Sequence, residues 1–252
     1  MIVPKALLTS GIIFPLYIFP SAPPSCSSWA PLVNSIAQNP NIPFYPIINP
    51  ASGPGPLPVD PSYQACIARL KAPNVAVLGY VATWFGDTTK SSGVVADVNT
   101  YAGWASAYRP DGIFFDQASS SAGDVSLYSQ YTSLAAQSFG GGAGVTTVLN
   151  HGTTPAAAFY NIADLLVTAE NFFTLFNPSS LVIGPTTPAS KQAVILTDAP
   201  ASPPTGLINT LVHTDHIRAL YITDDSQANG LNPYDSFPTQ WAAFVQAIVN
   251  AE

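Results

Sequence analysis

The fold is decided by the stretch Arg109-Pro110-Asp111-Gly112-Ile113-Phe114-Phe115-Asp116-Gln117. Its middle is a short apolar run of the kind that forms a strand buried on both faces of a parallel sheet. The run ends abruptly at Asp116 and Gln117, and small polar residues follow as far as Ser121. A carboxylate in this position lies at the carboxyl end of a core strand. In a parallel barrel the strand ends and the loops that follow them build the catalytic face.

Strand and helix signals alternate on both sides of this stretch. Apolar runs predict strands at 11–19, 44–49, 75–82, the run ending at Asp116, 145–150, 164–170, 192–198 and 219–224. Helical spacing and terminal signals predict helices near 27–38, 60–71, 97–108, 124–139, 155–161, 203–214 and 237–251, with a turn within 171–181. Asp97 is expected to cap the third helix. Pro46 weakens the second strand, because proline removes a ladder donor.

Eight strands separated by helices, without a break in composition, predict one α/β domain over residues 1–252, a single (β/α)8 TIM barrel. The length of 252 residues matches the roughly 250 that are typical of this fold. A doubly wound open sheet is the alternative. It is disfavoured because no Gly-rich phosphate loop follows the first strand, and the Gly-Pro-Gly run at 53–55 lacks the amide donors that a phosphate needs.

The composition restricts the class of partner. Only 8% of the residues are charged, 47% are hydrophobic and 25 are proline, which is typical of a secreted or wall-associated fungal-type protein. The net charge is −7 and there are seven Lys and Arg residues in total, so a nucleic-acid partner is not expected. An acidic surface favours a neutral or cationic ligand. We expect a monomer.

The chain contains two cysteines, Cys26 and Cys66. If they pair, the crosslink stabilises the fold by about 3 to 4 kcal/mol in the chain-entropy model. The alternative is two buried free thiols, because sequence does not show whether the two residues are close in space.

The chain is expected to have no membrane span, because its apolar run at 12–19 is interrupted by Pro15 and closed by Pro20. The first ten residues lack the layout of a signal peptide. We therefore expect that a leader was removed and that Met1 was restored for expression.

Polar side chains gather at the predicted strand ends, namely Asp116, Gln117, Asn150, His151, Glu170, Asp198, Asp224 and Asp225. Capping of the next helix, or tying of loops, explains the last three as well as ligand binding does. Asp116 and Glu170 each end an apolar strand directly. A partly buried carboxylate in such a place is costly unless it has a partner or a task.

Two carboxylates that face one cleft are what cleavage of a glycosidic bond requires. One protonates the leaving oxygen, and the other attacks the anomeric carbon or activates water. Tyr17 and Trp84 are candidates to stack on a sugar, although packing alone also explains aromatic residues near this face. Asn150 and His151 are expected to donate or accept hydrogen bonds with the substrate, together with Asp198 and Asp224.

Other chemistries fit the sequence less well. His213 and His216 are three residues apart on a predicted helix, but their polarity on a surface explains them equally, so no metal site is expected. No Gly-x-Ser-x-Gly nucleophile elbow is present. No cofactor is expected.

Five segments carry a family resemblance, and they follow one another in the family's order along nearly the whole chain: 13–20, 47–55, 77–83, 112–116 and 150–153. They resemble the successive signatures of the spherulin-4-like glycoside hydrolases, glycoside hydrolase family 135. The resemblance implies a (β/α)8 enzyme similar to the fungal hydrolases that cut galactosaminogalactan internally at its amino sugar. This glycan is an α-1,4-linked exopolysaccharide of galactose and N-acetylgalactosamine. In the family pattern the fourth strand ends in an Asp-Glu pair and the sixth strand supplies a further Glu.

Asp116 and Glu170 match this pattern, whereas Gln117 stands where the family has the second acid of the pair. An amide holds the shape of a carboxylate but neither titrates nor acts as a nucleophile. The expected function is therefore an endo-acting glycoside hydrolase, with Asp116 as nucleophile or electrostatic stabiliser, Glu170 as acid/base, and Gln117 orienting the substrate or marking an impaired position. The alternatives are a non-catalytic carbohydrate-binding protein of the wall or surface and a purely structural wall protein.

Overall fold

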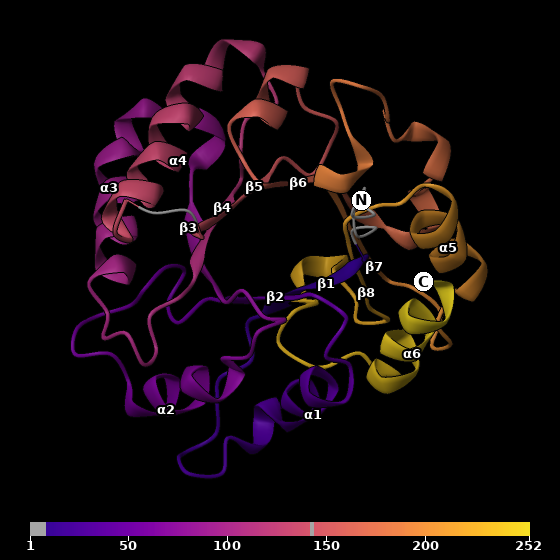
Figure 1. Ribbon diagram of the computed structural model, residues 1–252, viewed down its shortest axis with the longest axis horizontal. Helices are drawn as coiled ribbons and strands as arrows, with labels where there is room; N and C mark the ends of the chain where they lie inside the picture. Colours follow the sequence, from indigo (N-terminus) through magenta and orange to yellow (C-terminus); the bar gives the residue numbers. More distant parts are fainter. Residues whose placement is uncertain (1–8, 142–143) are drawn as a thin grey trace, which may run out of the picture.

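The computed structural model describes residues 9–141 and 144–252. Eight parallel strands close into a barrel in chain order (Figure 1), which confirms the predicted (β/α)8 architecture. The strands are β1 Gly11–Leu16, β2 Phe44–Ile48, β3 Leu78–Ala82, β4 Gly112–Asp116, β5 Thr146–Asn150, β6 Leu165–Phe172, β7 Gln192–Thr197 and β8 Ala219–Ile222. All eight lie within or close to the predicted runs.

The α-helices form a ring around the strands (Figure 1) and are α1 Ala30–Gln38, α2 Pro61–Leu70, α3 Ser91–Ala102, α4 Val125–Ser138, α5 Thr205–Asn209 and α6 Trp241–Ala251. A π-helical turn, Thr210–Thr214, continues α5. The connections after β5 and β6, every residue of which is described, contain 3-10 helices in place of an α-helix. The one predicted as a helix at 155–161 is the 3-10 helix Ala157–Asn161.

The third helix begins earlier than predicted, and Asp97 lies inside it rather than at its cap. The buried residues Val94, Val98 and Tyr101 define the face of α3 that packs on the barrel, and their spacing is that of a helix face. The capping role belongs to Asp87, whose carboxylate accepts the backbone N–H of Thr89 at 2.9 Å in the turn before α3.

Pro46 lies within β2 despite lacking a donor, because the ladder between β2 and β3 is interrupted beside it. The N–H of Phe44 donates to the carbonyl of Asn74, so the nitrogen two residues later also faces β3. Pairing between these strands is limited to a bridge from Phe44 to Val75 and to the last two residues of β2. No donor is needed where Pro46 lies.

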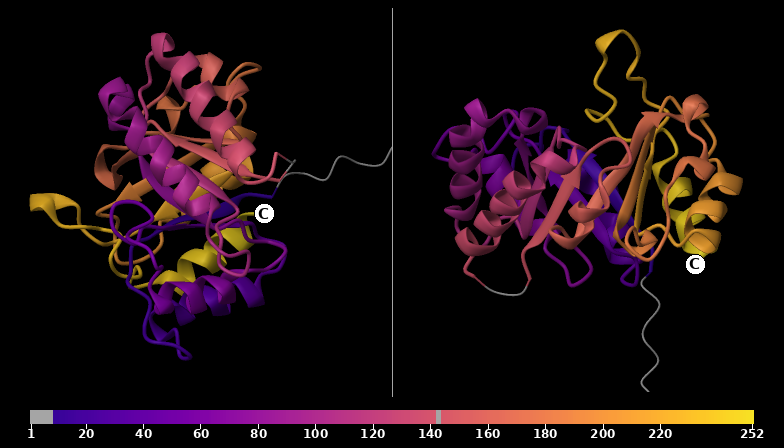
Figure 2. Two further views of the ribbon diagram at one scale, coloured as in Figure 1. Left: turned by 90° about the vertical axis from the view of Figure 1, so that its left-hand side faces the viewer. Right: turned by 90° about the horizontal axis from the view of Figure 1, so that it is seen from above.

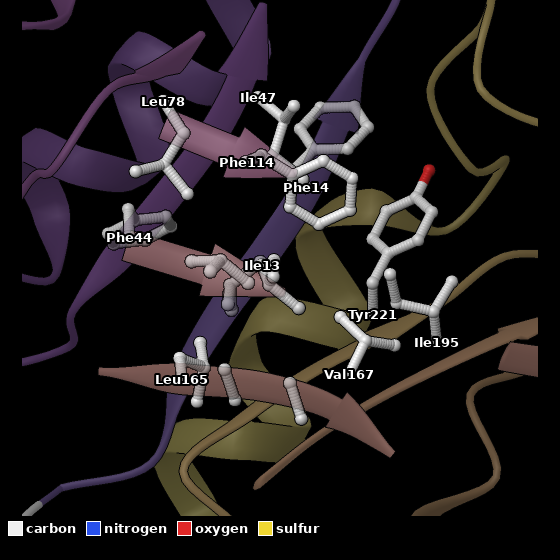
Figure 3. Packing of buried hydrophobic residues seen from close by; sticks show 14 of the residues in the cluster. Ile13, Phe14, Phe44, Ile47, Leu78, Phe114, Leu165, Val167, Ile195 and Tyr221 are labelled. Carbon is white, nitrogen blue, oxygen red and sulfur yellow. The ribbon is translucent and has the colours of Figure 1, made fainter. Parts of the chain in front are cut away.

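Apolar side chains fill and surround the barrel (Figure 3), among them Phe114, Leu165, Val167 and Ile195, all of which are buried. The start of β4 requires glycine: a Cβ on Gly112 would lie 1.8 Å from the backbone oxygen of β5. The strands therefore approach more closely here than any side chain permits.

Asp111, in the deciding stretch, holds the amino end of the barrel. Its Oδ1 accepts the ammonium of Lys71 at 2.7 Å, and its Oδ2 accepts the N–H of Val77 at 2.8 Å. Asp116 lies at the other end of the same strand, on the carboxyl face of the barrel. One end of this strand thus carries a carboxylate that holds the structure together, and the other carries a carboxylate at the face where barrel enzymes have their active sites.

Cys26 and Cys66 form a disulfide with a Cα–Cα distance of 5.6 Å, which ties the segment after β1 to α2. Within residues 9–141 and 144–252, no helix is both long and apolar enough to cross a membrane. The segment after β8 projects beyond the barrel further than the other connections (Figure 2, right).

Candidate active site

The side-chain amide of Asn150 joins the two predicted catalytic carboxylates. Its Nδ2 donates to Oδ1 of Asp116 at 2.7 Å and to Oε2 of Glu170 at 2.6 Å. The three residues end or nearly end β4, β5 and β6, which are adjacent strands of the barrel. Carboxyl ends of parallel strands meet at one edge, so these side chains converge on the same mouth.

A bulge in β6 aims Glu170 into the barrel. Asn150 lines the cavity and pairs with Val167, so Val167 also faces inward. Simple alternation would then turn Glu170 outward. The register against β7 shifts between Val167 and Ala169, and Glu170 instead pairs with Ile195, which lines the cavity. Bulges beside active sites re-aim side chains in this way.

Two tyrosines hold the outer oxygens of the carboxylates. The hydroxyl of Tyr80 donates to Oδ2 of Asp116 at 2.7 Å, and the hydroxyl of Tyr234 donates to Oε1 of Glu170. All four carboxylate oxygens therefore accept a hydrogen bond. Because each carboxylate is held at both oxygens, its plane is fixed before any ligand binds.

The environment of the site raises the pKa of Glu170 and of the two tyrosine hydroxyls. Burial and the nearby charge of Asp116 raise the pKa of Glu170, and the hydrogen bonds from Asn150 and Tyr234 offset part of that increase. Burial, followed by the charge of the neighbouring carboxylates, raises the pKa of the Tyr80 and Tyr234 hydroxyls far above the usual value. Both phenols stay protonated at physiological pH and act as donors.

Gln117 adopts a left-handed backbone conformation, with φ of 52°, directly after Asp116. This conformation is uncommon for a residue other than glycine. Its side chain lines the cavity, and its buried Oε1 has no hydrogen-bond partner within the described residues. The backbone carbonyl of Gln117 accepts the N–H of Phe85 at 2.7 Å and the hydroxyl of Thr83 at 2.9 Å. The turn is thus held by its backbone, and the hydrogen bonds that hold it do not involve the side-chain amide.

His151 is neutral. Its Nδ1 donates to the carbonyl of Ser119 at 2.9 Å, so Nε2 is the unprotonated nitrogen. Burial lowers the pKa of His151 to about 4, although the backbone hydrogen bonds act in the opposite direction. Its ring packs edge-on against Phe159 with centroids 4.6 Å apart. This environment suits a residue that shapes the cavity rather than one that carries a proton at neutral pH.

A cavity of about 540 Å³ lies over the carboxylates, within the usual size range of ligand sites. Of the predicted site residues it is lined by Tyr17, Asp116, Gln117, Asn150, His151 and Glu170. The ring of Tyr17 meets those of Tyr80 and Tyr234 edge-on, with centroids 5.7 Å and 5.5 Å apart. Tyr17 is therefore part of the aromatic wall around the carboxylates.

Three predicted substrate-binding residues do not line this cavity. The ring of Trp84 lies near Lys90, whose Nζ is 5.8 Å from the ring centroid. Asp198 accepts the hydroxyl of Ser226 at 2.6 Å, and Asp224 accepts the N–H of Thr239 at 2.9 Å. Both aspartates hold the connection after β8 in place, which is the loop-tying role that the sequence also allowed.

Tyr234 and its neighbours in the β8–α6 connection were not found from the sequence. Gln227, Leu231, Asn232 and Pro233 line the cavity with it. They lie in a polar, proline-containing segment with no period that predicts an orientation. The sequence signal for Tyr234 is that it is an aromatic residue in a long connection that follows a strand. The sequence likewise gives no signal that Tyr80 is the partner of Asp116.

Within residues 9–141 and 144–252 no group of three or more His, Cys, Asp or Glu side chains is arranged to hold a metal ion. The cavity lining contains no Lys or Arg side chain. The groups available for chemistry there are two carboxylates, four side-chain amides, tyrosine hydroxyls and one neutral imidazole. Such a set suits proton transfer and hydrogen bonding to a neutral polar ligand.

The fold and the site together define a (β/α)8 barrel with a carboxylate pair in a cavity at the carboxyl ends of its strands. Residues 11–248 match the model of the spherulation-specific family 4, and the chain belongs to this family. It is 28% identical over 247 residues to Spherulin-4 of Physarum polycephalum, covering 94% of this chain and 70% of that protein.

Solved structures with a similar fold include a relative of this chain's size and a more distant enzyme. The structure of Aspergillus clavatus Sph3 in complex with GalNAc superposes with a TM-score of 0.80 and 26% identity, covering 97% of this chain and 98% of Sph3. A chitinase from Chromobacterium violaceum has a TM-score of 0.53 and 13% identity, covering 96% of this chain and 99% of that chain. At so low an identity the chitinase supports the fold alone.

Proposed function

We propose that this protein is a glycoside hydrolase in which Asp116 and Glu170 act on the same glycosidic bond. The observation that carries the proposal is the amide of Asn150, which donates to both carboxylates at the floor of one cavity. Glycosidases cleave through an oxocarbenium-like transition state and need one carboxyl group as an acid and a second as a nucleophile or base. Asp116 and Glu170, which accept hydrogen bonds from the same amide group, meet that requirement.

Glu170 is the proposed acid/base. Burial and the charge of Asp116 raise its pKa, which favours the protonated form that a general acid needs. Asp116 is the proposed nucleophile or electrostatic stabiliser, oriented by Tyr80 and Asn150 at its two oxygens. The two carboxyl groups thus have different environments, as a pair with different roles requires.

The spacing favours a retaining mechanism. The two bonds to Asn150, 2.7 Å and 2.6 Å, add up to the largest possible separation of the two oxygen atoms. These oxygens therefore lie about 5 Å apart or less, which is the separation of retaining enzymes, whereas inverting enzymes leave about 6.5 to 9.5 Å for a water molecule. Asp116 is then placed to form a covalent glycosyl intermediate.

The proposed substrate is an α-1,4-linked polysaccharide that contains N-acetylgalactosamine, cleaved within the chain. Three observations support it: membership in the spherulation-specific family 4, the similarity to Sph3, whose structure holds GalNAc, and a cavity lined by neutral polar and aromatic groups around the carboxylates. A disulfide and the acidic, charge-poor composition support a secreted or wall-associated location, since disulfides persist in oxidising surroundings.

A second candidate is a carbohydrate-binding protein without catalysis. It is favoured by Gln117, which lines the cavity where the resemblance leads us to expect a glutamate. An amide keeps the shape of the site and its hydrogen bonds but does not titrate. In this case the cavity binds sugar and releases no product.

The test is to incubate the protein with galactosaminogalactan and to identify released oligosaccharides by mass spectrometry. We expect release by the chain itself, faster release by Gln117→Glu, and loss of release in Asp116→Asn and Glu170→Gln. Asp235→Asn, which changes an exposed carboxylate in the β8–α6 connection, is the matched control and should keep full activity. Binding without release, both in the chain and in Gln117→Glu, would establish the carbohydrate-binding alternative.

A further inference from the structure

Exposed apolar side chains concentrate on the carboxyl face of the barrel. Among the described residues, most of the large hydrophobic side chains that are exposed lie close after a strand end, namely Phe19, Leu57, Trp84, Phe85, Leu175 and Leu231, whereas Val182 and Ile183 lie near the start of β7 and Val95 lies on α3. Two of them, Phe85 and Leu231, also line the cavity over the carboxylates. Exposed apolar groups beside a site typically mark a ligand-binding surface.

Phe85 is presented by a strained turn. Trp84 and Phe85 both have φ of 52°, and Gly86 follows with φ of 84°, so three consecutive residues are left-handed. Two of these are bulky aromatic residues, for which this conformation is unfavourable. Such outliers persist only where surrounding bonds impose them, and they cluster at functional sites.

Hydrogen bonds connect this turn to the catalytic strand. The N–H of Phe85 donates to the carbonyl of Gln117 at 2.7 Å, and the N–H of Gly86 donates to the carbonyl of Thr83 at 3.0 Å. The hydroxyl of Thr83 donates to the carbonyls of Asp116 and Gln117 at 2.7 Å and 2.9 Å. The backbone of Phe85 is therefore held in a defined position relative to Asp116.

Leu231 forms a second apolar wall from the β8–α6 connection, which projects beyond the strand ends (Figure 2, right). Although the side chain of Leu231 is 61% exposed, its segment is anchored to the barrel. Asp198 accepts the hydroxyl of Ser226 at 2.6 Å and the N–H of Gln227 at 3.0 Å. Tyr234 in the same connection donates to Glu170. This wall is thus tied to the carboxylate pair as well.

We propose that Phe85 and Leu231 are positioning residues that hold the sugar ring next to the one at the carboxylate pair. This inference rests on the proposed glycoside hydrolase function and assigns the residues that bind the neighbouring unit of the chain. A galactose-configured ring has an axial hydroxyl at C4, which gathers the C–H groups of C3, C4 and C5 on one face. That face packs on an aromatic ring, while its hydroxyls stay in water.

The test compares Phe85→Ala and Leu231→Ala with the controls Phe19→Ala and Leu175→Ala, which alter exposed apolar residues that do not line the cavity. We expect Phe85→Ala to raise KM for the polysaccharide about tenfold, the upper range for one aromatic contact, with kcat changed less than twofold. Phe85→Tyr should restore KM, and the controls should match the parent. All substituted side chains are exposed, so folding should be preserved, which circular dichroism verifies.

Direct binding separates failure of this inference from failure of the proposed function. The dissociation constant of a GalNAc-containing oligosaccharide is measured by calorimetry in the Glu170→Gln background, with and without Phe85→Ala. A tenfold weaker affinity supports the inference even if the parent chain releases no product, in which case only hydrolysis is refuted. An unchanged KM and dissociation constant in Phe85→Ala overturn the inference while leaving hydrolysis intact.

Discussion

Tyr234→Phe removes a single donor from Glu170 and leaves the aromatic ring in place. Hydrogen bonds to charged groups contribute about 1.5 to 3 kcal/mol, which corresponds to a change of about 1 to 2 pKa units. The bond from Tyr234 lowers the pKa of Glu170, against burial and the charge of Asp116, which raise it. We therefore expect the pKa of Glu170 to rise further in the variant. If Glu170 is the acid, the alkaline limb of the pH–rate profile moves upward by the same amount.

The same change has a predicted sign for stability. Since the folded pKa of Glu170 lies above the ordinary 4.5, this group favours folding below pH 4.5, and that contribution is lost as pH rises through the folded pKa. Tyr234→Phe moves the upper end of this window to higher pH. Urea unfolding should therefore show a loss of about 1.5 to 3 kcal/mol where Glu170 is ionised and a smaller loss at pH 4, which lies below the raised pKa, so that the protonated form predominates.

Tyr160→Phe is the matched control, because the buried hydroxyl of Tyr160 has no hydrogen-bond partner within the described residues. Tyr160→Phe should not move the alkaline limb of the pH–rate profile. Any loss of stability that it causes should be equal at pH 4 and pH 7. In a Glu170→Gln background the pH dependence of the Tyr234→Phe effect should disappear. An alkaline limb that does not move, together with equal losses of stability at pH 4 and pH 7, would refute the assignment of Glu170 as a carboxylate held by Tyr234.

Three further predictions concern the fold and the imidazole. In chemical denaturation, Gly112→Ala should destabilise the protein by more than about 4 kcal/mol, because the new Cβ would lie 1.8 Å from the backbone oxygen of Thr146 in β5. Gly93→Ala in α3 is the contrast. It has open space around it and should stabilise the protein by about 0.5 to 1 kcal/mol. Replacing Cys26 and Cys66 by alanine should lower the free energy of unfolding by about 3 to 4 kcal/mol, given their sequence separation of 40. NMR titration should find His151 neutral down to a pKa of about 4, so its contribution to stability is present above pH 6.5 and is lost as pH falls toward 4.

Each of these has a clear contrary result. Equal effects of the two glycine substitutions would contradict the close approach of β4 and β5. A double cysteine variant as stable as the parent would contradict the crosslink. A His151 resonance that titrates near 6.5 would contradict its burial.

The barrel was predictable because its strands are continuous apolar runs. Parallel strands buried on both faces show this pattern, and the run before Asp116 is the clearest example. Local signals were less informative where tertiary contacts decide the outcome. Asp97 is a residue type that often caps a helix, but α3 begins before it, at Ser91, and its buried face begins at Val94. Pro46 has the chemistry of a strand breaker, but it lies at a gap in the ladder.

The candidate site was predictable at residue level at or close to strand ends, where the predicted residues that line the cavity are Tyr17, Asp116, Gln117, Asn150, His151 and Glu170. Asp116 and Asn150 end their strands and face the cavity. Glu170 reaches the same cavity through a bulge that alternation does not reveal. Phe85 lines the cavity and its neighbour Trp84 does not, in a turn where both residues have a left-handed backbone that the sequence does not reveal. Tyr234 comes from a segment far along the chain, and only the folded barrel brings it to Glu170.

The anomer released first tests most directly whether Asp116 and Glu170, whose carboxylate oxygens on Asn150 lie about 5 Å apart or less, flank one glycosidic bond. Proton NMR during cleavage of the α-linked glycan follows the new reducing ends before they equilibrate. If this pair cleaves with retention, the α-anomer appears first and then converts to the mixture. Initial release of the β-anomer would contradict the spacing and the role of Asp116, and release that persists in Asp116→Asn and Glu170→Gln would contradict the pair itself.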